Sequence, residues 1–187
     1  MSAKMTHAAA GAAIVTQPQL RIIAATAVRL AEVAAWPATE AELRKRLAQF
    51  TGIAVPGTPG QSAGGARYRV MMPARGRWMI AADASEALAR GLRGAIDARL
   101  GAVVDLSAAR VGFHLEGRHA RDLIAKLVPV DLDLARFGPG CVFQSGATHH
   151  IDVLVVREAA ERFTLYAESS YWRAIVEKLR AESREFV

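Results

Sequence analysis

The sequence predicts an α+β fold made of two ferredoxin-like halves, each with the order strand–helix–strand–strand–helix. Short segments in which apolar and polar residues alternate, as in half-buried strands, are interleaved with segments of helical periodicity. In addition, Arg77-Trp-Met-Ile-Ala-Ala-Asp83 and Arg162-Phe-Thr-Leu-Tyr-Ala-Glu168 lie 85 residues apart, and each precedes a helical pattern. A repeat of this order is typical of antiparallel sheets that carry their helices on one face.

Length and composition predict the domain organisation. The chain has 187 residues, of which 52% are hydrophobic, so it can bury a core without a metal or a disulfide. We expect a mobile N-terminal arm over residues 1–19 and a single domain over 20–187, with pseudo-repeat halves of about 20–100 and 101–187. The single cysteine, Cys141, cannot form an internal disulfide, which favours the cytoplasm. We expect neither an export signal at the N-terminus nor a membrane span.

The first elements run from residue 20 to residue 65. Residues 20–35 are apolar with few charges and are expected to form a half-buried strand region. Thr39-Glu-Ala-Glu42 is a capping box, in which the two end residues would satisfy amides at the start of a helix. The inner face of that helix is marked by Leu43, Leu47 and Phe50. Residues 56–65 are rich in Gly and Pro and are expected to be a mobile loop.

The first half continues with two strands, over 67–72 and 77–82. Asp83-Ala-Ser-Glu86 forms a second capping box before a helix. Gly91 and Gly94 each cost this helix about 1 kcal/mol against alanine, so we expect close packing to explain them. The inner face of the helix consists of Leu88, Leu92, Ile96 and Leu100.

The second half follows the same logic. Its first two strands cover residues 102–107 and 111–116, and a helix over 118–127 ends before Pro129. The Gly-Pro-Gly sequence of residues 138–140 predicts a turn. Three further strands and a last helix follow: strands over 141–145, 151–156 and 162–167, and a helix whose inner stripe is Trp172, Ile175, Val176 and Leu179.

The histidines do not have the spacing of a metal site. No pair lies four residues apart with a glutamate between, and the sequence contains no glycine-rich phosphate loop. His149 and His150 are adjacent, so in an extended segment their rings point to opposite faces and do not easily chelate one metal. We expect ordinary structural roles for all five histidines, which are His7, His114, His119, His149 and His150.

The other candidate side chains also favour structural roles. Cys141 follows a turn, but no histidine is placed beside it by the sequence, so a small core residue is favoured over a nucleophile. Trp78 and Trp172 fall in inner stripes and indicate packing. Four aspartates are acid–base candidates by residue type alone: Asp105, Asp122, Asp131 and Asp133. For Asp131 and Asp133, turn capping is an equally good explanation. We therefore predict no catalytic, cofactor-binding or metal-binding residue in this chain.

The charge is carried mainly by arginine. The formal net charge is +6, and only four of the 24 basic residues are lysines, so 20 are arginines. They are scattered and are not interleaved with aromatic residues, which disfavours a nucleic-acid surface. Two interpretations remain, solvated faces or an arginine-lined interface with another protein.

A run of residues in the second half resembles one family. The run comprises Val104-Val-Asp-Leu-Ser107, Arg110-Val111, Leu115-x-Gly117, Ala120-Arg-Asp-Leu123, Ala125-Lys126, Pro129-x-Asp-Leu132 and Phe137-x-Pro-Gly140. In this order it is similar to the gamma subunit of heterotetrameric sarcosine oxidase. The Arg77-Trp-Met-Ile strand and the closing helix with Trp172, ending in Glu185-Phe186, also resemble that family. Ser145 and the histidine-rich stretch at His149-His150 depart from it.

The resemblance implies a fold similar to the folate-binding half of the aminomethyltransferases. It also implies a non-catalytic accessory subunit, within a complex that demethylates sarcosine to glycine with tetrahydrofolate as the one-carbon acceptor. The alpha and beta subunits would hold FAD, FMN and NAD, the delta subunit would hold zinc, and this chain would hold no cofactor. The expected partners are the alpha and beta subunits, with delta in the same complex, and neither nucleic acid nor membrane.

Three functional hypotheses follow. An accessory subunit would expose a large apolar patch or self-associate when isolated. A stand-alone binder of folate or of another anionic ligand would instead direct its arginines into one cavity. An enzyme would need Cys141 or the His149-His150 pair, and it is the least favoured of the three.

Overall fold

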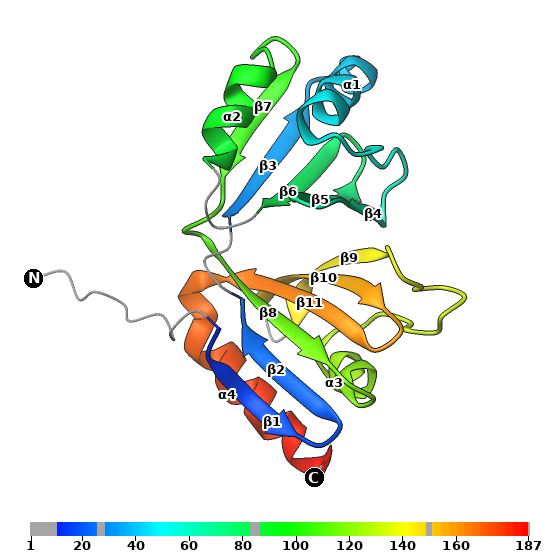
Figure 1. Cartoon of the computed structure of the whole chain (residues 1–187), viewed down its shortest axis with the longest axis vertical. Helices are drawn as coiled ribbons and strands as arrows, with labels where there is room; N and C mark the ends of the chain where they lie inside the picture. The colour runs from blue at the N-terminus through cyan, green and yellow to red at the C-terminus, as the bar shows by residue number, and fades with distance from the viewer. Residues whose placement is uncertain (1–10, 26–28, 83–86, 149–150, 187) are drawn as a thin grey trace, which may run out of the picture.

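Two antiparallel sheets lie face to face, and each carries its helices on its outer side (Figure 1). The computed structural model describes residues 11–25, 29–82, 87–148 and 151–186. Strands alternate their side chains between two faces, so each sheet contributes one face to a helix-covered core and the other to the junction between the sheets. The resulting order of layers is helices, sheet, sheet, helices.

The first sheet, called sheet B, is formed by residues 29–105. Its five strands have the order β4-β5-β6-β3-β7, and α1 and α2 cover its outer face. The strands are β3 (Arg29–Ala35), β4 (Gln61–Gly64), β5 (Tyr68–Ala74), β6 (Arg77–Ala82) and β7 (Gly101–Asp105), and the helices are α1 (Glu40–Thr51) and α2 (Leu88–Ala95).

The second sheet, called sheet A, has six strands in the order β1-β2-β8-β11-β10-β9. The helices α3 and α4 cover its outer face (Figure 1). The strands are β1 (Ala13–Gln17), β2 (Leu20–Ala24), β8 (Arg110–Glu116), β9 (Val142–Thr148), β10 (Ile151–Ala159) and β11 (Arg162–Glu168); the helices are α3 (Ala120–Leu127), α4 (Trp172–Ser183) and the 3₁₀ turns η1 (Ser169–Tyr171) and η2 (Arg184–Phe186).

The predicted repeat is confirmed by the strand order. Sheet B has the order β5-β6-β3-β7 beside its edge strand β4, and sheet A has the equivalent order β10-β11-β8-β2 beside β9. In each half the central strand that the sequence singled out, β6 or β11, leads into the helix that packs on its own sheet. This is the α+β architecture with two ferredoxin-like halves.

The expected boundary between the halves differs from the division between the sheets. The strand β2 belongs to sheet A although it lies in the predicted first half, and β7 belongs to sheet B although it follows residue 100. Residues 20–35 therefore form two strands in different sheets rather than one region. The reason is burial: Leu20 and Ile22 are at most 1% exposed in the core under α3 and α4.

The N-terminal arm is shorter than predicted. Residues 13–17 form β1, which pairs with β2, and Val15 is buried against the outer core of sheet A. Residues 1–10 lie outside the described residues. The predicted loop over 56–65 likewise contains β4, whose four residues pair with β5.

A third core joins the two sheets. Its buried side chains are Leu30, Met71 and Met79 from sheet B and Val142, Leu154, Val156 and Tyr166 from sheet A. Backbone hydrogen bonds also join the two halves near β4 and β9: Ser62 N donates to Gly140 O at 2.6 Å, and Val142 N donates to Gly60 O at 2.8 Å. The two halves therefore share a buried interface, as the sequence repeat implied.

The predicted capping box at α1 is wrong. Thr39 occupies the N-cap position but makes no side-chain cap; its hydroxyl donates to Leu100 O at 2.5 Å and to Trp36 O at 2.9 Å. The hydroxyl thus ties the start of α1 to the segment before β7 rather than to its own helix. The second predicted box, residues 83–86, lies outside the described residues.

The two glycines of α2 have different explanations. A Cβ on Gly91 would lie 3.0 Å from ring atoms of Phe50, so close packing of α1 against α2 accounts for Gly91 as predicted. A Cβ on Gly94 would meet nothing within 4 Å. For Gly94 the packing prediction is wrong.

Candidate functional site

The two described histidines are not brought together. His114 lies on β8 in the junction between the sheets, where its Nδ1 is 2.9 Å from Thr164 Oγ1. His119 lies at the N-cap of α3, with its Nδ1 3.3 Å from Asp122 Oδ2 and its ring stacked on Phe186. His7, His149 and His150 lie outside the described residues.

The aspartates support turns. Asp131 and Asp133 accept hydrogen bonds from the backbone N–H groups two residues further on, at 3.0 and 2.8 Å. These two residues therefore cap turns, the second of the two roles that the sequence left open for them. Asp105 accepts from Ser107 N at 3.0 Å, and the hydrogen bonds from Ser107 hold the pKa of Asp105 below its usual value. Asp122 faces His119. These contacts are local and do not converge on a cavity.

Cys141 and the two tryptophans pack as predicted. Cys141 is half-buried against the outer core of sheet A, directly before β9. The Trp78 ring is fully buried, and its Nε1 donates to Pro56 O at 3.0 Å. Trp172 stacks on Phe113 with ring centroids 5.1 Å apart. Across the described ranges, no three His, Cys, Asp or Glu side chains come together in a way that could hold a metal ion.

A polar cluster spans the junction between the sheets. Thr164 is fully buried, and its hydroxyl donates to Glu158 Oε1 at 2.9 Å. Because that hydroxyl proton is used, His114 Nδ1 must carry a proton and donate to Thr164 Oγ1. Glu158 also forms ion pairs with Arg69 of sheet B at 3.6 Å and Arg162 at 3.3 Å. The cluster thus links the two sheets electrostatically and has no reactive pair of groups.

Burial sets the protonation states in this junction. Burial lowers the pKa of the His114 imidazole; the nearby Glu158 opposes this shift, while Arg162 and Arg69 add to it. Burial also raises the pKa of the Tyr166 phenol to about 12. Neutral His114 and neutral Tyr166 are therefore the forms present at pH 7.

The His114 shift predicts a loss of stability in weak acid. Because the folded chain binds the His114 proton less tightly than the unfolded chain, the free energy of unfolding should fall as the pH drops below about 6.5. Denaturant titrations at pH 7.5 and 5.5 measure this, with His114→Gln as the comparison. The variant should lose less stability between the two pH values than the wild-type chain; an equal loss would contradict the assignment to His114.

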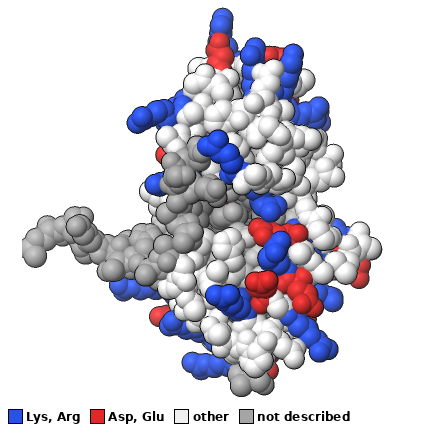
Figure 2. Space-filling view, in the orientation of Figure 1, with Lys and Arg blue, Asp and Glu red and all other residues white. Residues whose placement is uncertain are grey.

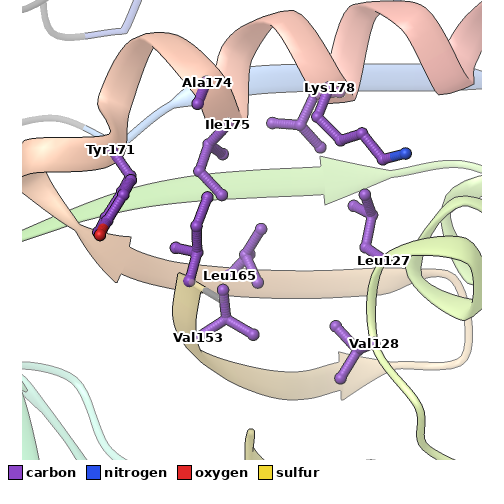
Figure 3. A pocket seen from close by; sticks show the side chains of 10 residues that line it. Leu127, Val128, Val153, Leu165, Tyr171, Ala174, Ile175 and Lys178 are labelled. Carbon is purple, nitrogen blue, oxygen red and sulfur yellow. The ribbon is translucent and has the colours of Figure 1, made fainter. Parts of the chain in front are cut away.

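An apolar cavity of about 290 Å³ lies between α4 and sheet A (Figure 3). Tyr171 and Lys178 are its polar lining residues, and Lys178 Nζ donates to Glu182 Oε1 at 2.7 Å. Such a cavity can receive an apolar side chain or a small apolar ligand, but it presents no acid–base pair. Its aliphatic walls come from α3, α4 and the strands β10 and β11: Leu127, Val128, Ile151, Val153, Leu165, Ala174, Ile175 and Leu179.

A second hollow, open to solvent and about 690 Å³ in volume, lies at the start of α1. Trp36, which follows β3, is 47% exposed there, and the hollow is also lined by Arg44 of α1 and Arg75 of the β5–β6 turn. Trp36 was not among the candidate residues predicted from the sequence. Its position directly before Pro37 and outside every predicted strand or helix was the available signal, since an aromatic residue in a turn has no inner face to pack on.

The arginines are distributed over many separate ion pairs. Arg77 donates to both carboxylate oxygens of Glu32, Arg110 pairs with Asp152 at 2.8 Å, and Arg99 pairs with Asp97 at 2.9 Å. The many-arginine cavity expected of a folate binder is therefore not formed by these side chains. No helix among the described residues is long and apolar enough to span a membrane.

Comparison with known proteins identifies the family, although no protein-family model matches the chain. The chain is 30% identical over 141 residues to sarcosine oxidase subunit gamma of Corynebacterium sp. (strain U-96), covering 75% of this chain and 68% of that protein. Its structure matches heterotetrameric sarcosine oxidase from Corynebacterium sp. U-96, in complex with pyrrole 2-carboxylate, with a TM-score of 0.81 and 25% identity over 93% of this chain and 88% of that chain.

A protein of a second class has a similar fold. Aminomethyltransferase T of the glycine cleavage system from Bartonella henselae matches with a TM-score of 0.68 and 21% identity, over 90% of this chain and 47% of that chain. This match confirms the aminomethyltransferase-like fold that the resemblance implied. The family follows from the 30% identity to the Corynebacterium subunit, with which the structural match to the heterotetrameric sarcosine oxidase agrees: the chain belongs to the family of sarcosine oxidase gamma subunits.

Proposed function

We propose that this chain is the gamma subunit of a heterotetrameric sarcosine oxidase and serves there as a non-catalytic accessory subunit. One observation carries the proposal: the fold superposes on a chain of that complex over 93% of its own length and 88% of the other chain. In our proposal the alpha and beta subunits are the direct partners, and the delta subunit belongs to the same complex. The reaction is the oxidative demethylation of sarcosine to glycine in the cytoplasm, with tetrahydrofolate as the one-carbon acceptor.

The cofactors are proposed to lie outside this chain. FAD, FMN and NAD would be bound by the alpha and beta subunits, together with tetrahydrofolate in the partner subunits. The contacts of these residues support a structural role: His114 is hydrogen-bonded to Thr164, Cys141 packs against the core, and Asp105, Asp131 and Asp133 accept hydrogen bonds from backbone N–H groups.

Co-purification tests the proposal directly. The chain is co-expressed with the alpha and beta subunits of a heterotetrameric sarcosine oxidase, with an affinity tag on the alpha subunit. We expect it to co-elute in equal stoichiometry and the complex to oxidise sarcosine, while the isolated chain shows no turnover and self-associates. A monodisperse monomer that does not bind the large subunits would overturn the proposal.

The lone thiol supplies a prediction that separates an accessory subunit from an enzyme. Substitution of Cys141 by alanine should leave the rate of sarcosine oxidation by the assembled complex unchanged, because the half-buried thiol packs against the core. Oxygen consumption with sarcosine measures the rate. A loss of turnover in a complex of normal stoichiometry would assign chemistry to Cys141.

Binding of folate by the isolated chain remains the second hypothesis. Calorimetry with tetrahydrofolate distinguishes the two, because an accessory subunit should give no heat of binding on its own. A binding isotherm with the isolated chain would instead favour the stand-alone folate binder.

A further inference from the structure

The open hollow at the start of α1, called the Trp36 hollow, has the properties of a binding site for a protein segment. Its apolar wall includes Trp36, Pro37, Ala38 and Ala41, and its charged lining residues are two arginines and one glutamate: Arg44, Arg75 and Glu40. Tryptophan and arginine are the residue types that most often carry the binding energy of protein interfaces. The inference deepens the proposed function and rests on it.

The Trp36 ring is held in place before any partner arrives. Its Nε1 donates to Ala98 O at 2.8 Å, and its backbone N–H donates to Leu100 O at 3.0 Å. Its carbonyl accepts from both the backbone N–H and the hydroxyl of Thr39, at 3.1 and 2.9 Å. An aromatic ring that is fixed and still 47% exposed loses little conformational entropy when it is covered.

The backbone beside Trp36 is strained. Ala38 has φ +68° and is the one non-glycine residue with positive φ among the residues that the structure describes. A side chain in this left-handed region costs free energy that glycine would avoid, and such strain is concentrated where a site must keep its shape. The strained turn keeps Pro37 and Ala38 in the wall of the hollow.

The electrostatics of the hollow select an acidic partner. The Arg75 side chain is 88% exposed, and its ion pair with Glu40, which also lines the hollow, is long, at 3.6 Å. Arg44 is exposed as well, whereas Arg46 is paired with Glu42 at 2.9 Å, so Arg44 and Arg75 are the basic side chains that face the hollow. Figure 2 shows more Lys and Arg than Asp and Glu at the end of the molecule where α1 and α2 lie.

We propose that the Trp36 hollow binds an acidic segment of the large subunits, with an apolar side chain of that segment against Trp36 and its carboxylates paired with Arg44 and Arg75. An arginine guanidinium binds a carboxylate through two parallel hydrogen bonds, so two arginines beside an aromatic ring recognise alternating acidic and apolar residues well.

The test measures the dissociation constant between the large subunits and variants of the full chain. Arg75→Glu and Arg44→Glu should each weaken binding at least about tenfold, and Trp36→Ala similarly, whereas Trp36→Phe, which keeps an aromatic ring, should lose less. Matched controls on the other half are Arg173→Glu, an exposed arginine of α4, and Leu134→Ala, an apolar residue that is 56% exposed. Both controls should bind like the wild-type chain.

Each outcome has a distinct meaning. If the wild-type chain does not bind the large subunits, the proposed function fails. Suppose that the wild-type chain binds the large subunits and that the dissociation constants of the Trp36 and arginine variants lie within about twofold of the wild-type value. The proposed function then stands, and only the Trp36 hollow is excluded as the binding site. Equal losses in Arg173→Glu and Arg75→Glu would show unspecific charge attraction and would also overturn the inference. The exposed Arg75 contributes little to folding, so its variant keeps the test valid if Trp36→Ala is unstable.

Discussion

Replacement of the buried Arg157 by methionine is expected to lower the free energy of unfolding by about 3 kcal/mol. Arg157 lies in β10 and is 2% exposed. Its guanidinium donates to the carbonyls of Leu132 at 2.9 Å, Phe137 at 2.7 Å and Ala160 at 2.7 Å, and it lies 5.1 Å from the centre of the Phe163 ring. Burial lowers the pKa of Arg157, yet an arginine stays charged at neutral pH.

The expected loss of stability in Arg157→Met arises from the irregular segment between α3 and β9. Residues 128–141 have no strand of their own, so the carbonyls of Leu132 and Phe137 need a donor, and Arg157 supplies it. Methionine fills a similar volume but leaves these acceptors unsatisfied, at about 1–3 kcal/mol each. Removal of a buried charge offsets part of this cost.

Denaturant unfolding of three variants checks the Arg157 prediction. Arg162→Met is the matched control, because the Arg162 side chain is 52% exposed and its ion pair with Glu158 should contribute only about 1 kcal/mol or less. Arg157→Lys should fall between the two, since one ammonium cannot reach several carbonyls in the plane of a guanidinium. Equal stability of Arg157→Met and Arg162→Met would show that the buried hydrogen bonds contribute nothing.

Substitution of Gly117 by alanine should cost about 3 kcal/mol or more, because two separate penalties act at one position. Gly117 has φ +118°, a conformation in which a side chain is strained. A Cβ there would also lie 2.7 Å from the carbonyl carbon of Gln19, and still closer to its oxygen. Since Gln19 immediately precedes β2, which is paired with β8, this backbone cannot move without disturbing sheet A.

Gly94 provides the matched control for Gly117. Gly94→Ala on the exposed side of α2 introduces a Cβ with nothing within 4 Å, so it should stabilise the chain by about 0.5–1 kcal/mol. Thermal unfolding of the two variants should therefore shift in opposite directions. A Gly117→Ala variant as stable as the wild-type chain would mean that the turn between β8 and α3 adapts freely.

Much of the secondary structure was predictable because its signals are local. The alternation in Arg67–Met72 and the stripe through Trp172 and Leu179 need only neighbouring residues, and both elements form within a few residues of their predicted bounds. The repeat at Arg77 and Arg162 also predicted the shared strand order of the two sheets, since equal local patterns favour equal topologies. The structural roles of Trp78 and of the turn aspartates followed from the same kind of local evidence.

The candidate sites were less predictable. The sequence pattern around Thr39 predicted a capping box. In the structure the Thr39 hydroxyl donates instead to the carbonyl of Leu100, 61 residues away in the chain. No sequence pattern predicted that Arg157 is buried. Its partners are backbone carbonyls, which every residue has, so the residue types do not reveal which carbonyls need a donor. Trp36 became a candidate only when the structure placed it, still exposed, beside Arg44 and Arg75.

The amino-acid sequence by itself determined the kinds of elements, the twofold repeat and the resemblance to the sarcosine oxidase gamma subunits. The tertiary structure alone decided that β2 completes sheet A in the place that β7 takes in sheet B, and which polar groups meet in the junction. The physical reason is range: periodicity records which face of an element is buried, whereas strand partners and buried hydrogen bonds depend on residues that become neighbours only after the chain has folded.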